Sequence, residues 1–242
     1  MPAAPVLALD EIDSTNAEAC RRAEAGEGGP LWITALRQTA GRGRRGRAWE
    51  TGARNLAATY LFTTRMRPAE AAQVSFVAAL AVGDLAQAFV PVSLVSLKWP
   101  NDLLLGGAKA AGILVESGAL PGERLWVAVG IGVNLAQSPA IPERPTTTFA
   151  VHMRTPAPAP LDALAVLAEA LERWRSLWEG AGFATIAEAW TRRAHGIGEA
   201  CEARLANETV RGVAEGLDLD GALKLRTSDG AVRRITAGDV FF

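Results

Sequence analysis

The order of short apolar runs and longer alanine-rich segments is the feature that most constrains the fold of this chain. Apolar runs with the length of strands occur at residues 6–12, 31–37, 55–64, 94–100, 101–117 and 124–135. Segments typical of helices occur at residues 16–26, 69–89, 161–180 and 183–196. Gly106 and Gly107 interrupt the fifth run as a two-residue hairpin turn does. The sequence therefore predicts an α/β (α+β) fold in which a mixed sheet is flanked by helices.

The pattern changes near Gly198. From there to the end of the chain, short alternating runs are separated by glycine and aspartate turns, at residues 201–207, 210–218, 222–228 and 232–242. A chain of 242 residues is long enough for one large domain and a small appendage. We therefore predict a large domain over residues 1–197 and a small β-barrel over residues 198–242.

Overall composition excludes several classes of protein. The formal net charge of −1 is unlike that of a generally basic nucleic-acid-binding protein. Cys20 and Cys201 lie far apart without metal-ligand spacing, which predicts buried, reduced thiols. There is no basic leader ahead of an apolar core, and no uninterrupted run of about 18 apolar residues. We expect a cytoplasmic protein that does not bind a membrane.

Positive charge is concentrated in one block, RQTAGRGRRG at residues 37–46, which has neither helical nor strand periodicity. Closely spaced glycines let several backbone N–H groups point at one anion, and arginines add bidentate donors for phosphate or carboxylate. The block therefore predicts a phosphate-binding loop. Its glycines and its arginines, which we expect to be unpaired, also predict that residues 39–52 are disordered without ligand. Nucleotide binding and nucleic-acid binding remain equally open, and a merely solvated charged loop is a third reading.

A second block, KWPNDLLLGGAKAAGILVE at residues 98–116, places two lysines around a Trp-Pro turn and an Asn-Asp pair. Gly112 permits close approach of the backbone to another group. Taken alone, the block is equally consistent with a strand, a turn and a hairpin whose lysines are solvated.

Four motifs together resemble the biotin protein ligases in their order and spacing: DSTN at 13–16, RQTAGRGRRGRAW at 37–49, residues 98–116, and GIGVNL at 130–135. The resemblance runs from about Val6 to Phe242. It implies a class II synthetase-like catalytic domain followed by a small SH3-like barrel. It also implies a two-step reaction, in which biotin and ATP form biotinyl-5'-AMP and pyrophosphate, and biotin then passes to a lysine of a carrier protein.

The resemblance implies a role for each site residue. The residues expected to contact biotin are Ser14, Thr15, Asn16, Gln38, Arg42, Gly43, Arg44, Lys109 and Gly112. Those expected to hold the nucleotide are Arg44, Arg47, Trp49, Lys98, Asn101, Asp102 and Asn134. Lys109, Arg44 and Arg47 are the expected catalytic residues, because cations must stand where charge develops on the α-phosphate. Asp102 is the expected Mg²⁺ ligand. Ser14 or Thr15 can instead simply cap a helix, and Trp49 and Trp99 can be core aromatics.

The expected partner is a biotin carboxyl carrier protein, that is, a biotin-accepting carboxylase domain. DNA binding is not expected, since only about five residues precede the first strand, whereas repressor-type relatives carry a helix-turn-helix there. An exposed strand edge could support a homodimer. The loop at 138–150 has no tryptophan to cover adenine, so Phe149 or Pro145 is expected to pack there.

Two other functions remain as alternatives: a lipoate ligase of related fold, and a nucleic-acid-binding module that uses the arginine block. Within the barrel, an acidic acceptor surface could meet the basic side chains Lys224, Arg226, Arg233 and Arg234.

Overall fold

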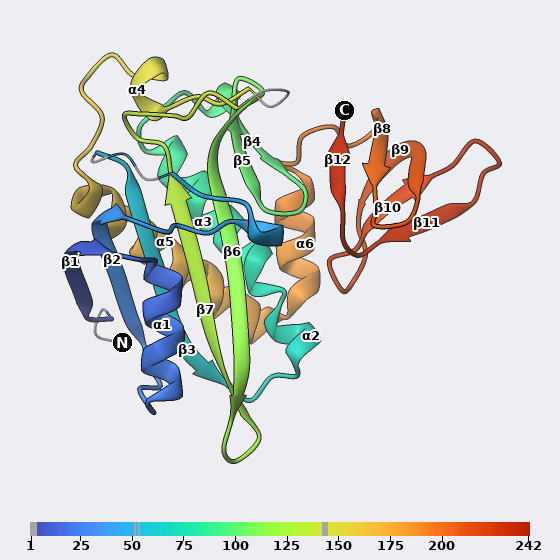
Figure 1. Cartoon of the computed structure of the whole chain (residues 1–242). Coiled ribbons are helices and arrows are strands. Elements are labelled where there is room, and N and C mark those ends of the chain that lie inside the picture. Colours follow the sequence, from blue (N-terminus) through green and yellow to red (C-terminus); the bar gives the residue numbers. More distant parts are fainter. Residues whose placement is uncertain (1–3, 51, 53, 142–144) are drawn as a thin grey trace.

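A seven-stranded mixed sheet forms the centre of the molecule (Figure 1). The computed structural model describes residues 4–50, 52, 54–141 and 145–242. In order across the sheet the strands are β1 (Val6–Ile12), β2 (Leu31–Gln38), β3 (Leu56–Thr64), β7 (Arg124–Val133), β6 (Ala108–Leu120), β5 (Asp102–Leu105) and β4 (Val95–Lys98). β1 pairs with β2 in parallel, and the other neighbours are antiparallel. The predicted mixed sheet is confirmed.

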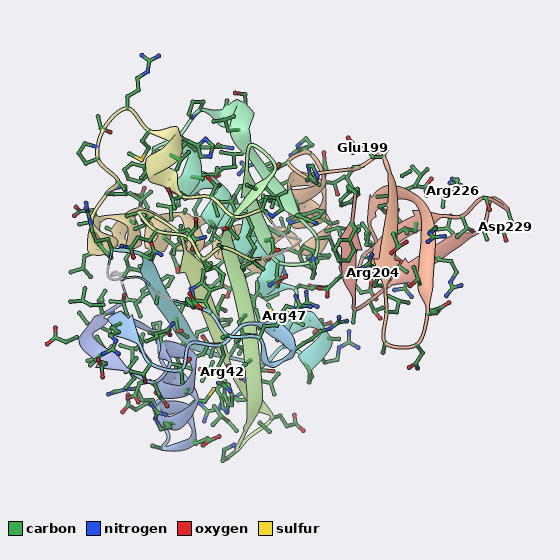
Figure 2. The ribbon with its side chains drawn as sticks, turned by 45° about the horizontal axis from the view of Figure 1, so that its top comes forward. Arg42, Arg47, Glu199, Arg204, Arg226 and Asp229 are labelled. Atoms are coloured by element: carbon green, nitrogen blue, oxygen red, sulfur yellow. The ribbon has the colours of Figure 1, made fainter. Side chains whose placement is uncertain are left out.

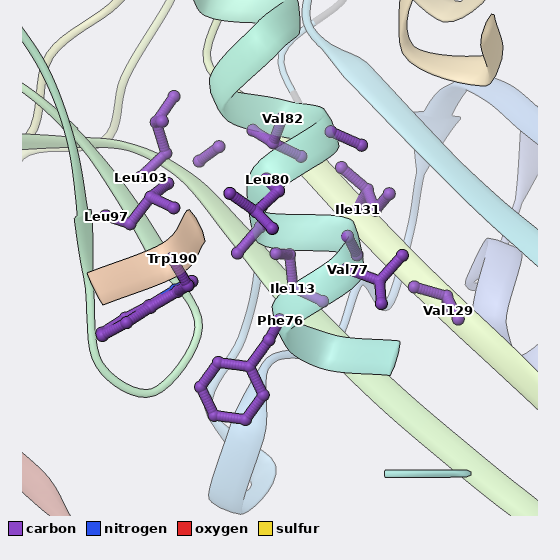
Figure 3. Packing of buried hydrophobic residues seen from close by; sticks show 14 of the residues in the cluster. Phe76, Val77, Leu80, Val82, Leu97, Leu103, Ile113, Val129, Ile131 and Trp190 are labelled. Atoms are coloured by element: carbon purple, nitrogen blue, oxygen red, sulfur yellow. The ribbon is translucent and has the colours of Figure 1, made fainter. Parts of the chain in front are cut away.

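Helices cover both faces of this sheet. One face packs against α3 (Val74–Gln87) and α5 (Pro160–Ala181), with α6 (Phe183–Thr191) packed against these two helices, and the other carries α1 (Thr15–Glu24). Figure 3 shows side chains of α3, among them Val77 and Leu80, packed against Ile113, Val129 and Ile131 of the strands. All five side chains are almost completely buried. Burial of this apolar layer is the main source of stability, at about 25 cal/mol per Å² removed from water.

The structure corrects several element boundaries. The predicted helix at 69–89 divides into α2 (Pro68–Ala71) and α3, and the helix at 183–196 ends at Thr191. The run at 232–242 forms two strands instead of one, because Gly238 lies between them. The predicted loop at 138–150 leads into a short helix, α4 (Phe149–His152). Gly106 and Gly107 both have positive φ angles, as the predicted hairpin turn requires.

The segment Pro68–Gln87 is long and apolar enough, by length and composition alone, to cross a membrane. Most of it is buried inside the protein between the sheet and α5. Core packing therefore accounts for its apolar composition.

A five-stranded antiparallel sheet forms the C-terminal part of the chain, to one side of the large sheet (Figure 1). Its order is β11 (Val232–Ile235), β10 (Leu223–Arg226), β9 (Thr209–Leu217), β8 (Ala200–Arg204) and β12 (Asp239–Phe241). The indole of Trp99 donates a hydrogen bond to the Gly221 carbonyl at 3.1 Å. A Cβ on Gly221 would lie 2.4 Å from the Phe76 ring. The small sheet therefore packs closely against α3 and the turn after β4, and Trp99 is a buried aromatic of that contact.

Three of the four basic side chains expected to meet an acidic acceptor form ion pairs within this small sheet, which weakens that expectation. Arg233 pairs with Glu208, Arg226 pairs with Glu215, and Arg234 pairs with both Asp218 and Asp220. Long-range steering needs uncompensated charge, so this face offers an acidic partner little attraction.

Cys20 and Cys201 are free thiols, but only Cys201 is fully buried. Cys20 is partly exposed, which corrects the expectation of full burial. Desolvation nevertheless raises the pKa of the Cys20 thiol to about 11, so neither cysteine is expected to be reactive near neutral pH.

Asp84 on α3 ties three elements together. Its carboxylate accepts hydrogen bonds from Arg193 at 2.6 Å, Trp174 at 2.7 Å and Arg173 at 2.8 Å. Burial raises the pKa of Asp84, but these donors outweigh that effect, so the pKa lies below its ordinary value of 3.8. We expect Asp84→Asn to lower the free energy of unfolding by about 1.5–3 kcal/mol.

The pH dependence of this loss follows from the direction of the shift. The stabilisation from Asp84 is complete above the unfolded-state pKa and disappears as the pH falls through the folded-state pKa. Urea unfolding at pH 7 should therefore separate the two proteins clearly, and the gap should shrink at acidic pH. A gap that stayed constant into strong acid would contradict this account of the carboxylate.

Candidate active site

One cavity of about 550 Å³ lies on the face of the large sheet that also carries α1. Strands β6 and β7 form its floor, the arginine-rich loop passes over it, and β12 of the small sheet reaches its edge. Every residue that the motifs predict for the site lies on its wall: Ser14, Thr15, Asn16, Gln38, Arg42, Gly43, Arg44, Arg47, Trp49, Lys98, Asn101, Asp102, Lys109, Gly112 and Asn134. Four sequence motifs thus come together, although the roles of their residues stay predictions.

A polar cluster occupies the end of the cavity next to the start of α1. Ser14 is the N-cap of this helix, and its hydroxyl accepts a hydrogen bond from the Ala17 amide. The Thr15 amide and hydroxyl both donate to the side-chain oxygen of Gln38, at 2.8 and 3.1 Å. Asn16 donates from its amide to Glu116 at 2.9 Å and accepts from Thr59 at 2.7 Å. The cluster is rigid and presents both donors and acceptors, because each side chain is held by its neighbours.

Two glycines of β7 allow other side chains to lie directly on the strand. A Cβ on Gly130 would lie 2.1 Å from the Asn16 amide oxygen. A Cβ on Gly132 would lie 2.3 Å from the Trp49 ring. Glycine is therefore required at these positions for the observed packing, and the GIGVNL motif supplies it.

A lysine and an aspartate form an ion pair further along the cavity. Lys109 Nζ lies 2.6 Å from Asp102 Oδ1 and 5.7 Å from the centre of the Trp49 ring. Both charged side chains are largely buried, with 23% of Lys109 and 18% of Asp102 exposed. A bulge between Leu103 and Leu104 shifts the pairing of β5 with β6 by one residue. The result is an ammonium group fixed on the cavity floor beside a carboxylate.

The arginine-rich loop is held by contacts from three directions. Arg42 pairs with Glu116 at 3.1 Å, and Arg44 donates to the side-chain oxygen of Asn101 at 3.1 Å. Arg45 and Arg47 both pair with Asp239 of the small sheet. Figure 2 shows Arg42 and Arg47 on this loop, with Arg47 on the side nearer the small sheet. The sequence prediction that these arginines are unpaired is therefore wrong.

Burial changes the acid-base character of one of these arginines. Desolvation lowers the pKa of Arg44 from its ordinary value. Arginine stays protonated at neutral pH even so, since its ordinary pKa exceeds 12. A partly desolvated guanidinium interacts with an anion more strongly than a solvated one does.

Asn134 closes the far wall and has an unsatisfied polar atom. Its side-chain amide donates to the Thr147 carbonyl at 3.2 Å. Its Oδ1 is buried and has no hydrogen-bond partner among the residues that the structure describes. A buried acceptor without a partner lowers stability by about 1–3 kcal/mol. A ligand that donates a hydrogen bond to this oxygen would recover that free energy.

The structure separates the two residues expected to cover an adenine ring. Phe149 is completely buried in the core and does not line the cavity, so that expectation is wrong. Pro145 does line the cavity, beside Thr146. Residues 142–144 of the same loop lie outside the described part of the chain.

Sequence reasoning missed two carboxylates that hold the loop. Glu116 lies within the second motif, but nothing in the sequence distinguishes it from a solvated strand residue. Asp239 lies 192 residues beyond Arg47, and its neighbours Val240 and Phe241 also line the cavity. A contact between residues so far apart produces no local sequence pattern, so it can be identified only from the three-dimensional structure.

Asp102 is the residue expected to bind Mg²⁺, and its surroundings can be compared with what that ion needs. In the part of the chain that the structure describes, no group of three or more His, Cys, Asp or Glu side chains could hold a metal. Mg²⁺ usually binds one or two carboxylates and completes its shell with water and substrate phosphates. Asp102 fits that pattern as a single carboxylate on the cavity wall. The side-chain oxygen of the neighbouring Asn101 already accepts a hydrogen bond from Arg44.

Comparison with known proteins gives the same assignment throughout the chain. The profile of the Biotin/lipoate A/B protein ligase family matches residues 10–134, and that of the Biotin protein ligase C terminal domain matches residues 196–242. A Biotin--[acetyl-CoA-carboxylase] ligase from Paracoccus denitrificans is 45% identical over 97% of this chain and 99% of that protein. The chain belongs to the biotin protein ligase family.

Solved structures of biotin protein ligases share this fold over both sheets. The Aquifex aeolicus enzyme in complex with biotin and ATP has a TM-score of 0.79 and 25% identity, covering 98% of this chain and 97% of that one. The Leishmania major enzyme in complex with biotinyl-5-AMP has a TM-score of 0.68 and 25% identity, covering 98% of this chain and all of that one. The SH3-like region expected at the C-terminus corresponds to the antiparallel sheet described above.

Proposed function

We propose that this chain is an ATP-dependent biotin protein ligase. In the first step a carboxylate oxygen of biotin attacks the α-phosphorus of ATP, forming biotinyl-5'-AMP and releasing pyrophosphate. In the second, the amine of an acceptor lysine attacks the acyl carbon, forms an amide, loses a proton and releases AMP. The observation that carries this proposal is a single cavity with a rigid polar cluster at one end and fixed cations further along.

The polar end suits the ureido ring of biotin. That ring has two N–H donors and one carbonyl acceptor, so it needs acceptors and donors in fixed positions. Ser14, Thr15, Asn16 and Gln38 carry both kinds of group, and their mutual hydrogen bonds fix their orientation. Arg42 and Gly43 line the same cavity, as does Gly112, which lies beside Trp49 and Lys109.

The cationic part suits the carboxylate and the α-phosphate. Both are anions, so they repel each other until fixed positive charges stand between them. Lys109 on the floor and Arg44 and Arg47 on the loop supply these charges from opposite sides. Mg²⁺, held by Asp102 and the triphosphate, would neutralise further charge on the leaving pyrophosphate.

The remaining wall suits a nucleoside. The unpartnered Oδ1 of Asn134 can accept a hydrogen bond from the exocyclic amine of adenine. Trp49 offers an aromatic surface, while Lys98 and Asn101 lie on the same wall. Pro145, which lines the cavity, is the apolar contact that we propose for the base in place of Phe149.

The partner and location follow from the chemistry and the family. The acceptor that we propose is a biotin carboxyl carrier protein, meaning a biotin-accepting carboxylase domain, in the cytoplasm, and we propose no binding to DNA or membranes. A homodimer through an exposed strand remains an expectation. Of the two outer strands of the large sheet, β1 is the place where it would form, because the backbone of Leu97 in β4 already forms hydrogen bonds with Arg193 and His195.

A direct assay distinguishes this function from its alternatives. Purified protein is incubated with ATP, Mg²⁺ and either biotin or lipoate, and pyrophosphate is measured. We expect release with biotin, and a mass increase in an added biotin carrier domain. Release only with lipoate would favour the lipoate ligase. Release with neither, combined with binding to an oligonucleotide, would favour the nucleic-acid-binding module.

The loop at 39–52 is the part expected to move during this reaction, although Thr51 lies outside the described residues. Its glycines predict a loop that is disordered without ligand and closes over the adenylate to exclude water, although the contacts of its arginines hold residues 42–47 in this structure. Cleavage by chymotrypsin after Trp49 should therefore slow when biotin and ATP are added. Equal rates with and without the two ligands would contradict closure.

A further inference from the structure

The arginine-rich loop is attached to both parts of the molecule. Glu116 and Asn101, which hold Arg42 and Arg44, belong to the large sheet and its connections. Asp239, which holds Arg45 and Arg47, belongs to the small sheet, on β12. The segment 45–47 is therefore held by a carboxylate that lies outside the four motifs of the sequence.

The backbone of the loop is bent so that both arginines reach this carboxylate. Arg45 has a φ of 57° and a ψ of 32°, which is the left-handed region that few non-glycine residues adopt. Gly46 follows with a φ of 71°. A left-handed arginine is strained and persists only where other contacts hold it. The pairing with Asp239 is the contact that holds the Arg45 side chain.

Asp239 also faces the cavity. It lines the cavity wall beside Val240 and Phe241, and only 21% of its side chain is exposed. β12 itself is fixed by its pairing with β8, where Asp239 stands opposite Arg204. Asp239 is thus a rigidly placed anion at the border between the loop, the cavity and the small sheet.

We propose that Asp239 is a positioning residue, which holds the turn at residues 44–47 closed over the cavity by pairing with Arg45 and Arg47. The small sheet thereby becomes part of the closed state of the loop. Arg47 is presented to the cavity before any phosphate arrives, so less ordering of the loop remains when the nucleotide binds. The mechanistic consequence rests on the proposed function, but the pairing itself does not.

The first test measures loop opening in the ligand-free protein, which needs no catalytic activity. Chymotrypsin cleavage after Trp49 is followed by mass spectrometry for the wild type, Asp239→Asn and Glu215→Gln. Glu215 pairs with Arg226 in the same sheet, away from the loop, and serves as the matched control. Two partly exposed ion pairs are lost in Asp239→Asn, so we expect cleavage to be on the order of tenfold faster. The control should keep the wild-type rate.

The dependence of the cleavage rate on salt concentration distinguishes a positioning role through charge from a purely structural role of Asp239. Both arginines are about half exposed, so salt should weaken their pairing with Asp239 and speed wild-type cleavage. Asp239→Asn should lose most of this salt dependence, and Asp239→Glu should recover it. Arg45→Gln in the Asp239→Asn background should add less than it does alone, since the two side chains share one interaction.

The second test concerns the intermediate. If the closed loop retains biotinyl-5'-AMP, the intermediate should leave Asp239→Asn several-fold faster, with biotin affinity unchanged. Unchanged cleavage and unchanged salt dependence in Asp239→Asn would overturn the positioning role. A lower KM for ATP with no faster cleavage would also overturn it, and would make Asp239 a competitor of phosphate. Failure of the proposed function would abolish the second test and leave the first unaffected.

Discussion

Lys109→Ala is expected to lose most biotinyl-5'-AMP synthesis while it keeps the fold. Lys109 supplies the fixed positive charge on the cavity floor, within a largely buried site where a charge acts more strongly than in water. Removing one such contact to a developing negative charge typically costs roughly 10²- to 10³-fold in rate. The measurement is pyrophosphate release from biotin and ATP at saturating concentrations of both.

The ion pair with Asp102 makes a control necessary. Lys109→Ala leaves the Asp102 carboxylate largely buried without its cation, which destabilises the protein independently of catalysis. Asp102→Asn breaks the same pair but keeps the lysine, so its thermal unfolding gives the cost of the broken pair. Near-normal pyrophosphate release by folded Lys109→Ala would remove Lys109 from the mechanism.

The mixed sheet and many of the residues that line the cavity could be predicted from the sequence, because both depend on local patterns. Apolar runs of strand length identify strands, and Gly106–Gly107 fixes a hairpin with two positive φ angles. The four motifs contain many residues of the cavity wall, and strand pairing brings them together, for example by placing Gly112 opposite Gly132. Family resemblance then gave these residues roles that periodicity alone does not show.

The partners of the charged residues could not be predicted, since they depend on contacts between distant segments. Arg47 meets Asp239 only because the small sheet packs beside the large one. Phe149 resembles an exposed loop aromatic in the sequence, yet α4 turns it into the core. Composition does not distinguish an ion pair from a solvated charge, so the arginines appeared unpaired until the fold was known.

The second large effect is expected at Gly130, where the floor of the cavity touches the polar cluster. A Cβ at this position would lie 2.1 Å from Asn16 Oδ1 and 2.7 Å from Asn16 Cγ. Asn16 has almost no freedom to move, because Thr59, Glu116 and the Leu114 carbonyl hold its amide and only 3% of the residue is exposed. Gly130→Ala must therefore displace Asn16 and break hydrogen bonds in the cluster.

Each buried polar group left without a partner costs about 1–3 kcal/mol, so we expect Gly130→Ala to weaken biotin binding by roughly 10- to 100-fold. Titration calorimetry with biotin measures this loss without ATP or an acceptor. Gly180→Ala on α5 is the matched control, because a Cβ there meets nothing within 4 Å and alanine favours a helix.

Asn16→Ala removes the atoms with which the new methyl group collides. Adding Gly130→Ala to Asn16→Ala should therefore cost much less than Gly130→Ala costs alone. Full additivity of the two substitutions would show that Gly130 acts on biotin by a route other than Asn16.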